Sequence, residues 1–286
     1  MPRISYVNGR YEPHSDAMVH IEDRGYQFAD GVYEVCEVAH GFVVDMTGHL
    51  DRLDRSLSEL RMAWPISRRA LEVVIGEVVS RNRVRNGLVY LQVTRGVAPR
   101  YFLFPTATRS SLVVTARKIE PAVNANKAEA GIKVITVPEN RWDRVDIKTV
   151  GLLPNVLAKE AAKAAGAQEA WFVDTDGNVK EGGSSNAWIV TKEGVLVTRP
   201  ADHGILRGIT RTTLFEVARK LGLKIEERPF SVYEAKAARE AFISSATTIA
   251  MPVVAIDASP IANGHPGSVV LSLRQAFFDV AEKRRA

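Results

Sequence analysis

The order of hydrophobic and polar positions predicts that the chain begins with β-structure. Residues 4–11 alternate on both sides of Asn8-Gly9, a dipeptide typical of a two-residue hairpin turn. Residues 32–39 alternate again with the period of a strand, and residues 42–44 bring the chain back beside them. These patterns predict two hairpins near the start of the chain.

Two helices and two further strands are predicted next. Leucines recur with helical spacing after the second hairpin, and Ser67 is a suitable N-cap for a second helix. The predicted elements are helices over residues 48–60 and 67–83 and strands over residues 88–95 and 111–118. Residues 120–131 contain glycine, proline and polar residues, which indicate a linker between domains. We therefore expect a small α/β domain over residues 1–119.

The remainder of the chain predicts a larger second domain over residues 132–286. Strands and helices alternate here less regularly than in a doubly wound sheet. The predicted elements are strands over residues 132–137, 170–173, 187–190, 195–198, 241–244 and 253–256, and helices over residues 155–166, 210–221 and 268–283. The fold class expected from this order is α+β with two domains.

Composition narrows the class of protein. The chain has 286 residues, of which 46% are hydrophobic, so it can bury a large core. Cys36 is the one cysteine, which excludes an internal disulfide framework. No N-terminal apolar run and no long hydrophobic span indicates secretion or membrane insertion. We therefore expect a cytoplasmic protein.

The charge of the chain leaves a second class of function to consider. A net charge of +5 and a pI near 9.3 would suit a nucleic-acid-binding or interaction protein. The arginines of residues 52–55 and 81–85, however, lie on predicted helices without interleaved aromatic residues, which indicates solvated faces. A basic bias also suits anionic substrates and a phosphorylated cofactor. We expect no nucleic-acid partner, no membrane partner and no metal.

Lys148 is the first candidate for chemistry. It lies between a predicted buried strand and an alanine-rich helix, among Ile147, Val150 and Leu152. Removing an ammonium group from water lowers its pKa, so Lys148 could act as an amine nucleophile toward an aldehyde. On composition alone, a solvated loop lysine is the simpler interpretation.

A candidate anion site lies at Gly208-Ile209-Thr210, where the helix over residues 210–221 is predicted to begin. The free N–H groups and the dipole of a helix N-terminus attract a phosphate. Ile209 would bind through its backbone, and Thr210 through its backbone and its hydroxyl.

Six segments, in this order, carry a resemblance to a known family. They are DGVYEV (residues 30–35), HLDRLDRS (49–56), TRGVAPR (94–100), DIKTVGLLPNVLAKE (146–160), EGGSSN (181–186) and GILRGITR (204–211). Together they cover most of the chain, and it is similar to the fold type IV aminotransferases, which use pyridoxal 5'-phosphate (PLP). Within that family it most resembles the D-amino-acid aminotransferase branch.

The resemblance implies a role for each cofactor-binding residue. Lys148 would be the Schiff-base lysine, and its released amine would move a proton between the substrate Cα and the cofactor. Glu181 would keep the pyridine nitrogen protonated, and Ser184, with Ser185 and Asn186, would support the ring or its hydroxyl. Arg52 resembles the phosphate-binding arginine of the family, although a surface ion pair with a neighbouring aspartate is the simpler interpretation without the resemblance.

A second phosphate loop is implied within residues 242–253. Relatives usually carry a threonine where this chain has Ala246, so Ser245 and Thr247, the nearest hydroxyls, both remain candidates for the phosphate.

The resemblance also implies substrate-binding residues. Tyr33 and Arg100 match positions that bind the substrate α-carboxylate in the D-amino-acid branch, and the arginine reaches the site of the partner subunit. The fork of donors in an arginine can bind both carboxylate oxygens. Phe102 stands where that branch places a histidine, two residues after the arginine.

The activity implied is transamination between a D-amino acid, such as D-alanine, and a 2-oxo acid, such as 2-oxoglutarate or pyruvate. It would run as a ping-pong reaction through pyridoxamine phosphate in a homodimer. A branched-chain L-amino-acid aminotransferase, an (R)-amine transaminase and an aminodeoxychorismate lyase of the same fold are the alternatives, and DGVYEV with TRGVAPR favours the D-specific branch.

Overall fold

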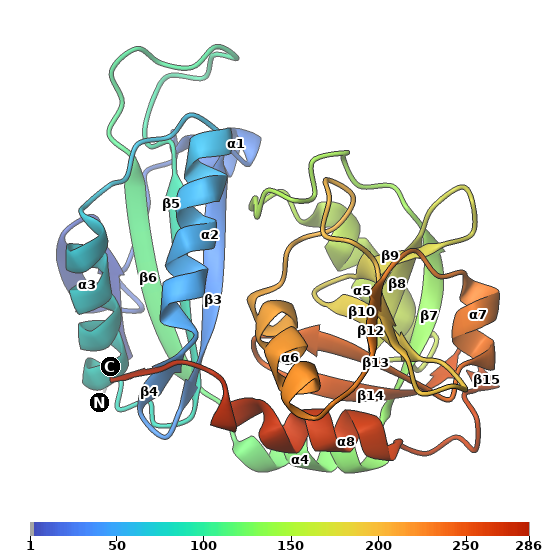
Figure 1. The fold of residues 1–286 in the computed structure, drawn as a ribbon. Coiled ribbons are helices and arrows are strands. Elements are labelled where there is room, and N and C mark those ends of the chain that lie inside the picture. Colours follow the sequence, from blue (N-terminus) through green and yellow to red (C-terminus); the bar gives the residue numbers. More distant parts are fainter. Residues whose placement is uncertain (1–2, 286) are drawn as a thin grey trace. The chain divides into compact units, whose positions relative to one another are not determined.

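A computed structural model describes residues 3–285, which form two compact units (Figure 1). The first unit comprises the chain up to Pro121, the short segment Ile147–Gly151 and the stretch that begins at Glu282. The second comprises Ala122–Asp146 and Leu152–Ala281. The chain therefore changes unit more than once, and the segment that carries Lys148 belongs to the first unit.

The stretch expected to be a linker, residues 120–131, differs from the prediction. It forms helix α4 (Pro121–Ala130), because its alanines favour helix and its one proline stands at the first position, where a missing N–H costs nothing. The chain also returns to the first unit at Ile147 and Glu282, which no single linker provides. Contacts between distant segments determine that division, so local composition did not reveal it.

The first unit is built on an antiparallel seven-stranded sheet with the order β16-β4-β3-β5-β6-β1-β2. Its strands are β1 (Ile4–Val7), β2 (Arg10–Pro13), β3 (Gly31–Ala39), β4 (Phe42–Val44), β5 (Gly87–Thr94), β6 (Ser111–Lys118) and β16 (Lys283–Arg285). Its helices are α1 (Arg24–Phe28), α2 (Met46–Glu59) and α3 (Arg68–Arg81). Both predicted hairpins and both predicted helices are confirmed.

Hydrophobic residues of α2 and α3 form the core of this unit with one face of the sheet. Leu50, Leu53 and Leu57 of α2 are buried in one cluster with Val32 and Cys36 of β3. The predicted N-cap of α3 is also confirmed, since the Ser67 hydroxyl accepts a hydrogen bond of 3.2 Å from the Ala70 N–H. Amphipathic spacing therefore sets which face of α2 meets β3.

The second unit contains a nine-stranded mixed sheet. Along its path the order is β12-β11-β10-β13-β14-β7-β8-β9, with β15 paired to β14. The strands are β7 (Ile132–Pro138), β8 (Glu169–Val173), β9 (Val179–Gly182), β10 (Asn186–Val190), β11 (Leu196–Thr198), β12 (Ile225–Glu227), β13 (Glu240–Ser245), β14 (Ile249–Ile256) and β15 (Ser259–Pro260). Because β9 also contacts β10, the sheet curls back on itself.

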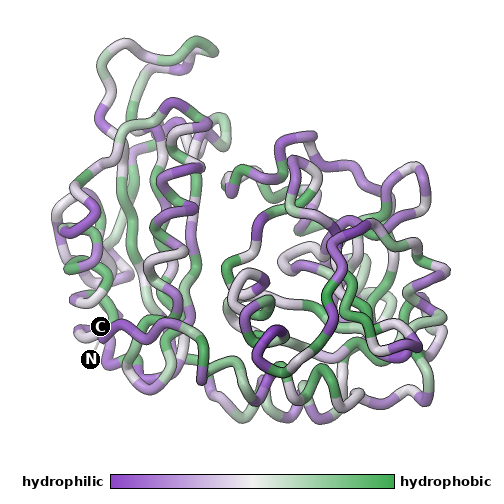
Figure 2. The backbone as a smooth tube through the Cα atoms, viewed as in Figure 1, coloured by the Kyte–Doolittle hydropathy of each residue, from purple (hydrophilic) through white to green (hydrophobic). Residues whose placement is uncertain are grey.

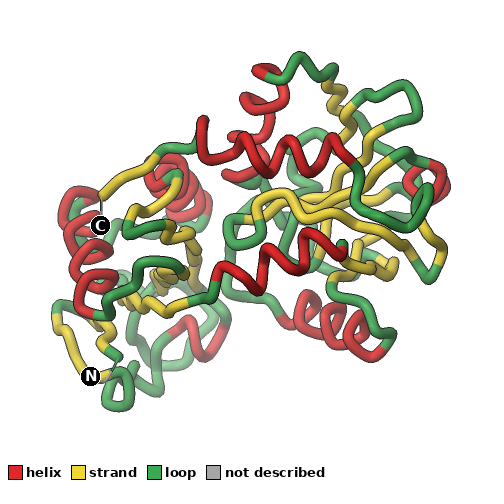
Figure 3. Tube along the Cα trace, turned by 90° about the horizontal axis from the view of Figure 1, so that it is seen from below, coloured by secondary structure: helices red, strands yellow, loops and turns green. Residues whose placement is uncertain are grey.

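Helices cover this second sheet, as Figure 3 shows. Besides α4 they are α5 (Leu153–Ala164), α6 (Ile209–Lys220), α7 (Val232–Ala237) and α8 (Ser268–Ala276). α5 packs on β7 and β8, and α8 packs on β13 and β14. No helix within residues 3–285 combines the length and apolar composition needed to cross a bilayer.

The predicted C-terminal helix over residues 268–283 is too long. α8 ends at Ala276, a 3₁₀ turn follows over Phe277–Asp279, and Lys283–Arg285 pairs with β4 as strand β16. Asp45 fixes Glu282, the residue before β16, by two hydrogen bonds. The Asp45 N–H donates to the Glu282 carbonyl, and the Asp45 carboxylate accepts from the Glu282 N–H. Long-range pairing outweighs the local helical pattern here. The fold class, α+β, is confirmed.

Candidate active site

The segment that carries Lys148 extends the edge of β3. The Tyr33 N–H donates to the Lys148 carbonyl at 3.0 Å, and the Val150 N–H donates to the Gly31 carbonyl at 3.0 Å. On the helix side, the Ser56 hydroxyl of α2 lies 3.4 Å from the Lys148 N–H. The backbone of this lysine is therefore fixed between a strand and a helix, which the sequence predicted only as a loop between packed elements.

The Lys148 side chain lies over an aromatic ring. Its Nζ is 4.2 Å from the centroid of the Tyr33 ring, a cation–π contact. The residue is half-buried, and within the described part of the chain no carboxylate forms an ion pair with its amine. Two predicted site residues are thus brought together, and the amine is available to a ligand.

A buried charged cluster lies on the neighbouring face of β3. Arg52 binds both oxygens of Glu34, with Nε at 2.8 Å and Nη2 at 2.7 Å, and His49 Nδ1 lies 2.7 Å from Glu34 Oε2. Burial alone would raise the pKa of Glu34, but Arg52 and His49 lower it to about 2. Burial lowers the pKa of His49, so this ring is neutral near pH 7 and donates to the carboxylate.

The simpler interpretation of Arg52, a surface ion pair with an aspartate, is therefore wrong. Its side chain is buried, and its partner is a glutamate on another element. The sequence contained a signal for Glu34, because this residue alternates with Val32 and Cys36 on the apolar face of a strand. A carboxylate on a buried face requires a cationic partner.

The predicted substrate residues Arg100 and Phe102 lie on the long loop between β5 and β6, which projects from the sheet in Figure 1. The Arg100 guanidinium lies 4.8 Å from the centroid of the Phe28 ring, and the Phe102 ring packs 5.6 Å from the same ring. Phe102 is 81% exposed. Within one chain, neither residue makes a contact with Tyr33 or Lys148 among the interactions of the described residues.

The second unit presents Glu181, on β9, as a buried carboxylate. Its Oε1 accepts from Arg141 Nη1 at 2.6 Å, and its Oε2 accepts from the Asn186 amide at 3.1 Å and from the Leu206 N–H at 3.0 Å. Burial raises the pKa of Glu181, while Arg141 and the Leu206 N–H oppose that rise. On balance the pKa of this buried carboxylate is raised above its ordinary value, and Arg141 is the charge that favours its ionised form.

Arg141, which sequence reasoning missed, is itself rigidly held. Glu139 binds its Nε at 2.9 Å and its Nη2 at 2.6 Å, and the Phe172 ring centroid lies 4.2 Å from its guanidinium carbon. Burial would raise the pKa of Glu139, but its hydrogen bonds and charge contact with Arg141 lower it to about 2, and Lys180 adds to this at 3.2 Å. No pattern in the sequence marked Arg141, since both it and Glu139 follow a strand in a polar turn.

The candidate anion site is confirmed as the start of a helix. α6 begins at Ile209 with Gly208 as its N-cap, and Thr210 is buried in the first turn. A Cβ on Gly208 would lie 2.1 Å from the Asn186 Oδ1, so only glycine permits this close approach. Asn186 also donates to the Leu206 carbonyl at 2.9 Å, and therefore links Glu181 to the segment that leads into α6.

The predicted serine and threonine ligands have partners of their own. The hydroxyls of Ser184 and Ser185 donate to the buried carboxylate of Glu169, at 3.2 and 3.1 Å. The Ser245 hydroxyl pairs with Thr248, at 2.7 Å, and the Thr247 carbonyl accepts from Asn124. Ser184 thus supports the bend after Glu181, and Thr248 is a third hydroxyl at the second loop.

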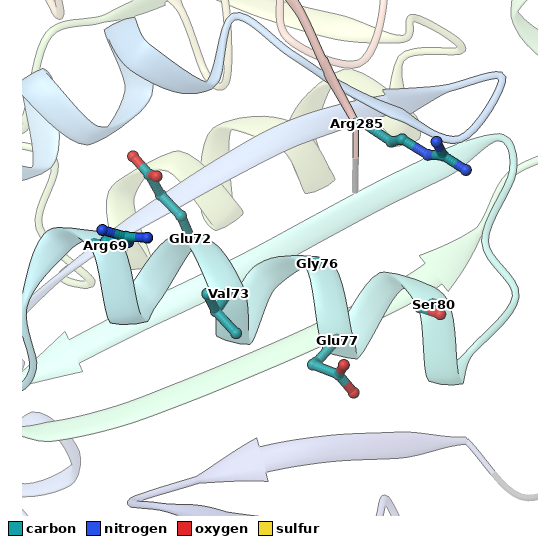
Figure 4. A pocket seen from close by; sticks show the side chains of 7 residues that line it. All are labelled: Arg69, Glu72, Val73, Gly76, Glu77, Ser80 and Arg285. Atoms are coloured by element: carbon teal, nitrogen blue, oxygen red, sulfur yellow. The ribbon is translucent and has the colours of Figure 1, made fainter.

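A separate hollow of about 400 Å³ follows α3 in the first unit (Figure 4). It is lined by Arg69, Glu72, Val73, Gly76, Glu77, Ser80 and Arg285. None of the predicted site residues lines this hollow, so it is separate from the residues around Lys148.

Comparison with known proteins identifies relatives along nearly the whole chain. Residues 31–256 match the sequence model of the family described as amino-transferase class IV. A D-alanine aminotransferase of Listeria innocua serovar 6a is 39% identical over 274 residues, 96% of this chain and 94% of its own. One of Bacillus licheniformis is 38% identical over 270 residues, 94% of each chain.

Solved structures give the same fold. A branched-chain amino acid aminotransferase from Escherichia coli is 24% identical, with a TM-score of 0.89, and covers 98% of this chain and 94% of its own. A hypothetical aminotransferase from Mycobacterium tuberculosis in a PLP-bound form is 25% identical, with a TM-score of 0.83, and covers 96% of this chain and 98% of its own.

Proposed function

The chain belongs to amino-transferase class IV, and from this membership we propose that it exchanges an amino group between a D-amino acid, such as D-alanine, and a 2-oxo acid, such as 2-oxoglutarate or pyruvate. The family confirms the resemblance drawn from the six motifs and the expectation of an aminotransferase. The identity of 35–40% to D-alanine aminotransferases favours that substrate class over the branched-chain enzymes, whose identity is 24–27%.

The proposed cofactor is PLP, which supplies an aldehyde and an electron-withdrawing ring when it is bound. The residues present fit it. Within residues 3–285 the Lys148 amine has no carboxylate partner, Glu181 is a buried carboxylate that accepts a hydrogen bond from Arg141, and α6 begins at Ile209 with Gly208 as its N-cap. The environment of the Lys148 amine is the observation on which the proposal rests. A partly buried amine that lies on an aromatic ring rather than on a carboxylate suits covalent catalysis.

Each residue has one task in the proposed mechanism. Lys148 Nζ would hold the cofactor's aldehyde group and, when free, would carry a proton to and from the substrate Cα. Glu181 would favour the protonated form of the ring nitrogen, because an ionised carboxylate stabilises a nearby positive charge. Ile209 and Thr210 would bind the phosphate through their N–H groups, and Arg52 and the Ser245–Thr248 hydroxyls would be further donors.

For the substrate, we assign Tyr33 and Arg100 to the α-carboxylate. Phe102 gives this part of the site an apolar wall in place of the histidine of the D-amino-acid branch. The protein would act as a homodimer, with Arg100 reaching the partner's site, because within one chain Arg100 contacts Phe28 rather than Tyr33. Large apolar side chains exposed on the same loop, Tyr101 and Leu103, are consistent with such a partner.

The test combines cofactor attachment with turnover. Purified protein should show a visible absorbance band with PLP, and borohydride should fix the cofactor to Lys148, as located by peptide mass spectrometry. D-Alanine with 2-oxoglutarate should then give D-glutamate and pyruvate, faster than L-leucine gives its oxo acid. Lys148→Ala should reduce turnover at least about 10⁴-fold, because it removes both the imine donor and the proton carrier.

Lys163→Ala is the matched control, since Lys163 is 79% exposed on α5. It should leave turnover within about twofold. If the protein takes up no PLP, or if Lys148→Ala keeps wild-type activity, the assignment of PLP and Lys148 is wrong. If the protein prefers L-leucine to D-alanine, the branched-chain L-amino-acid aminotransferase is the correct alternative.

A further inference from the structure

The loop between β5 and β6, residues 96–109, is closed at its base. Gly96 has φ +98°, and a Cβ at this position would lie 2.1 Å from the Arg109 carbonyl oxygen. The two ends of the loop therefore touch, and a side chain larger than hydrogen does not fit between them. The loop that carries Arg100 and Phe102 is thus a defined unit rather than an open excursion.

The first half of this loop runs beside the start of α1. The Arg24 N–H donates to the Gly96 carbonyl at 2.9 Å, and the Ala98 N–H donates to the Glu22 carbonyl at 3.2 Å. Asp23, the N-cap of α1, forms a bridge with Val97. Backbone pairing therefore fixes the loop as far as residue 98.

Beyond residue 98 the side chains of the loop bury little surface. Tyr101 is 64% exposed, Phe102 81% and Leu103 67% (Figure 2 shows this hydrophobic tip). Burial of apolar area cannot hold such a tip in one conformation within the chain. Another interaction must set the position of the backbone between Arg100 and Phe102.

Arg24 supplies that interaction. Its side chain is only 3% exposed, its Nε donates to Asp30 Oδ2 at 2.8 Å, and its Nη1 donates to the Tyr101 carbonyl at 2.6 Å. The Tyr101 carbonyl belongs to the peptide between Tyr101 and Phe102, one residue after Arg100. A buried guanidinium therefore fixes the backbone at the point from which both substrate residues project.

Arg95 holds the far side of the same tip. Its Nε donates to the same Asp30 Oδ2 at 2.7 Å, its Nη2 donates to the Leu60 carbonyl at 2.8 Å, and its guanidinium carbon lies 3.6 Å from the Phe104 ring centroid. Asp30 thus orients two arginines at once, one toward Tyr101 and one under Phe104. Charge-assisted bonds of this kind are among the strongest that a surface loop can use.

We propose that Arg24, Asp30 and Arg95 form a positioning cluster that sets how the loop presents Arg100 to the substrate carboxylate, an inference that rests on the proposed function. None of the three touches the substrate. They act through the Tyr101 carbonyl and the Phe104 ring, and so determine affinity for carboxylated substrates. A displacement of about 1 Å in such a positioned group can cost up to about 100-fold in rate.

The test is a double-mutant cycle between the cluster and Arg100, measured as kcat/KM for D-alanine. Arg24→Lys keeps the charge but cannot span both Asp30 Oδ2 and the Tyr101 carbonyl. Alone it should lower kcat/KM about 10- to 100-fold, mainly through KM. In the Arg100→Ala background it should lower kcat/KM less than about twofold, because the arginine that it positions is already gone.

Two further variants make the result decisive. Asp30→Asn removes the negative charge that both arginines share and should lower kcat/KM as Arg24→Lys does. It replaces Arg24→Lys in the test if Arg24→Lys folds poorly. Arg109→Lys, at an exposed arginine of the same loop, should change kcat/KM less than about twofold. Absorbance of bound PLP should be unchanged in every variant that folds.

The outcomes separate this inference from the proposed function. If the wild type does not transaminate D-alanine, the proposed function fails. If it does, but the effects of Arg24→Lys and Arg100→Ala multiply, the cluster acts on folding alone and the inference is overturned. Loss of PLP binding in Asp30→Asn and Arg24→Lys would overturn it as well.

Discussion

Glu181 is the residue at which burial and charge compete most directly. In the proposed function its carboxylate has to be ionised to favour a protonated ring nitrogen, yet burial favours the neutral acid. Arg141, at 2.6 Å, opposes the effect of burial on the pKa of Glu181, and Glu139 holds Arg141 in that orientation. Removing the arginine should therefore change the pH at which Glu181 loses its charge, rather than the fold around it.

We predict that Arg141→Met moves the acidic limb of the kcat/KM profile to higher pH. Arg141 lowers the pKa of Glu181, so its removal raises that pKa, and Glu181 becomes protonated at a pH where the wild type is still ionised. Lys180→Met is the control, because Lys180 pairs with Glu139 and not with Glu181. An acidic limb that stays in place in Arg141→Met would contradict this role.

The link between β3 and α2 shows how two elements share one buried carboxylate. Glu34 comes from the strand, and His49 and Arg52 come from adjacent turns of the helix, so the three meet only when α2 packs with its leucine face on β3. A buried pair of this kind contributes little relative to an apolar pair of the same size, but a single unpaired member is costly. The cluster therefore fixes the register of α2 on β3 more than it adds stability.

We predict that Arg52→Met lowers the free energy of unfolding by about 3 to 5 kcal/mol, because it leaves Glu34 buried without its charge partner. The double variant with Glu34→Gln should recover a large part of that loss. Arg55→Met, which changes an exposed pair on the same helix, should cost less than about 1 kcal/mol. Urea unfolding without added PLP measures all three, and a double variant no more stable than Arg52→Met would exclude this account.

The same pair predicts how stability depends on pH. The folded pKa of Glu34, about 2, lies below its ordinary value of 4.5, so its contribution of about 3 kcal/mol is present above pH 4.5 and is lost as the pH falls toward 2. In Glu34→Gln, the loss of stability that comes from protonating residue 34 should be absent. The loss that comes from protonating Glu139, whose pKa is also lowered to about 2, should remain.

Local signals determined which elements were predicted. The Asn8-Gly9 turn and the Ser67 cap act within a few residues, and the leucine spacing of α2 repeats within one helix, so each could be recognised from the sequence. Strand β16 could not, because Lys283–Arg285 is polar and pairs with β4 across most of the chain. α1 was missed because it has only five residues, too few for a periodic pattern.

The same distinction applies to the residues of the candidate site: local motifs marked some of them, and only contacts in the fold reveal the others. Motifs marked Lys148, Tyr33 and Glu181 as candidates, since each lies within a characteristic run of residues. Arg141 and Arg24 act through partners that folding alone brings near, at Glu181 and Tyr101, and nothing in their own neighbourhoods distinguishes them from surface arginines. The residues that orient the proposed chemistry are therefore less visible in the sequence than those that perform it.

At the scale of the whole molecule, exposed apolar residues gather on α5 of the second unit and in two segments of the first unit. Met18, Ile21 and Tyr26 precede or belong to α1, and residues 101–104 form the loop tip, where exposure ranges from 46% at Phe104 to 81% at Phe102. Exposed apolar clusters of this kind are typical of protein interfaces. They support the proposed homodimer, in which the tip would be covered.

We predict that the protein sediments at twice its chain mass of 31.4 kDa, and that Leu103→Glu raises the dimer dissociation constant at least about tenfold. A charge at a position covered by a partner must be desolvated, which weakens association. Val123→Glu, at a half-exposed position on α4, should leave the sedimentation unchanged. A monomeric wild type, or equal dimer strength in both variants, would remove the proposed interface.

The path of the chain through its two units has a consequence for how the protein is made. The first sheet receives residues 147–151 at the edge of β3 and β16 beside β4, and both are translated after the rest of that sheet, β16 only after the second unit is complete. A ribosome-bound chain therefore holds an unfinished first sheet with a free edge while the second unit emerges. Until β16 is translated, the edge of β4 that it pairs with stays open to other strands, so the first unit depends on residues that follow the second unit in the chain.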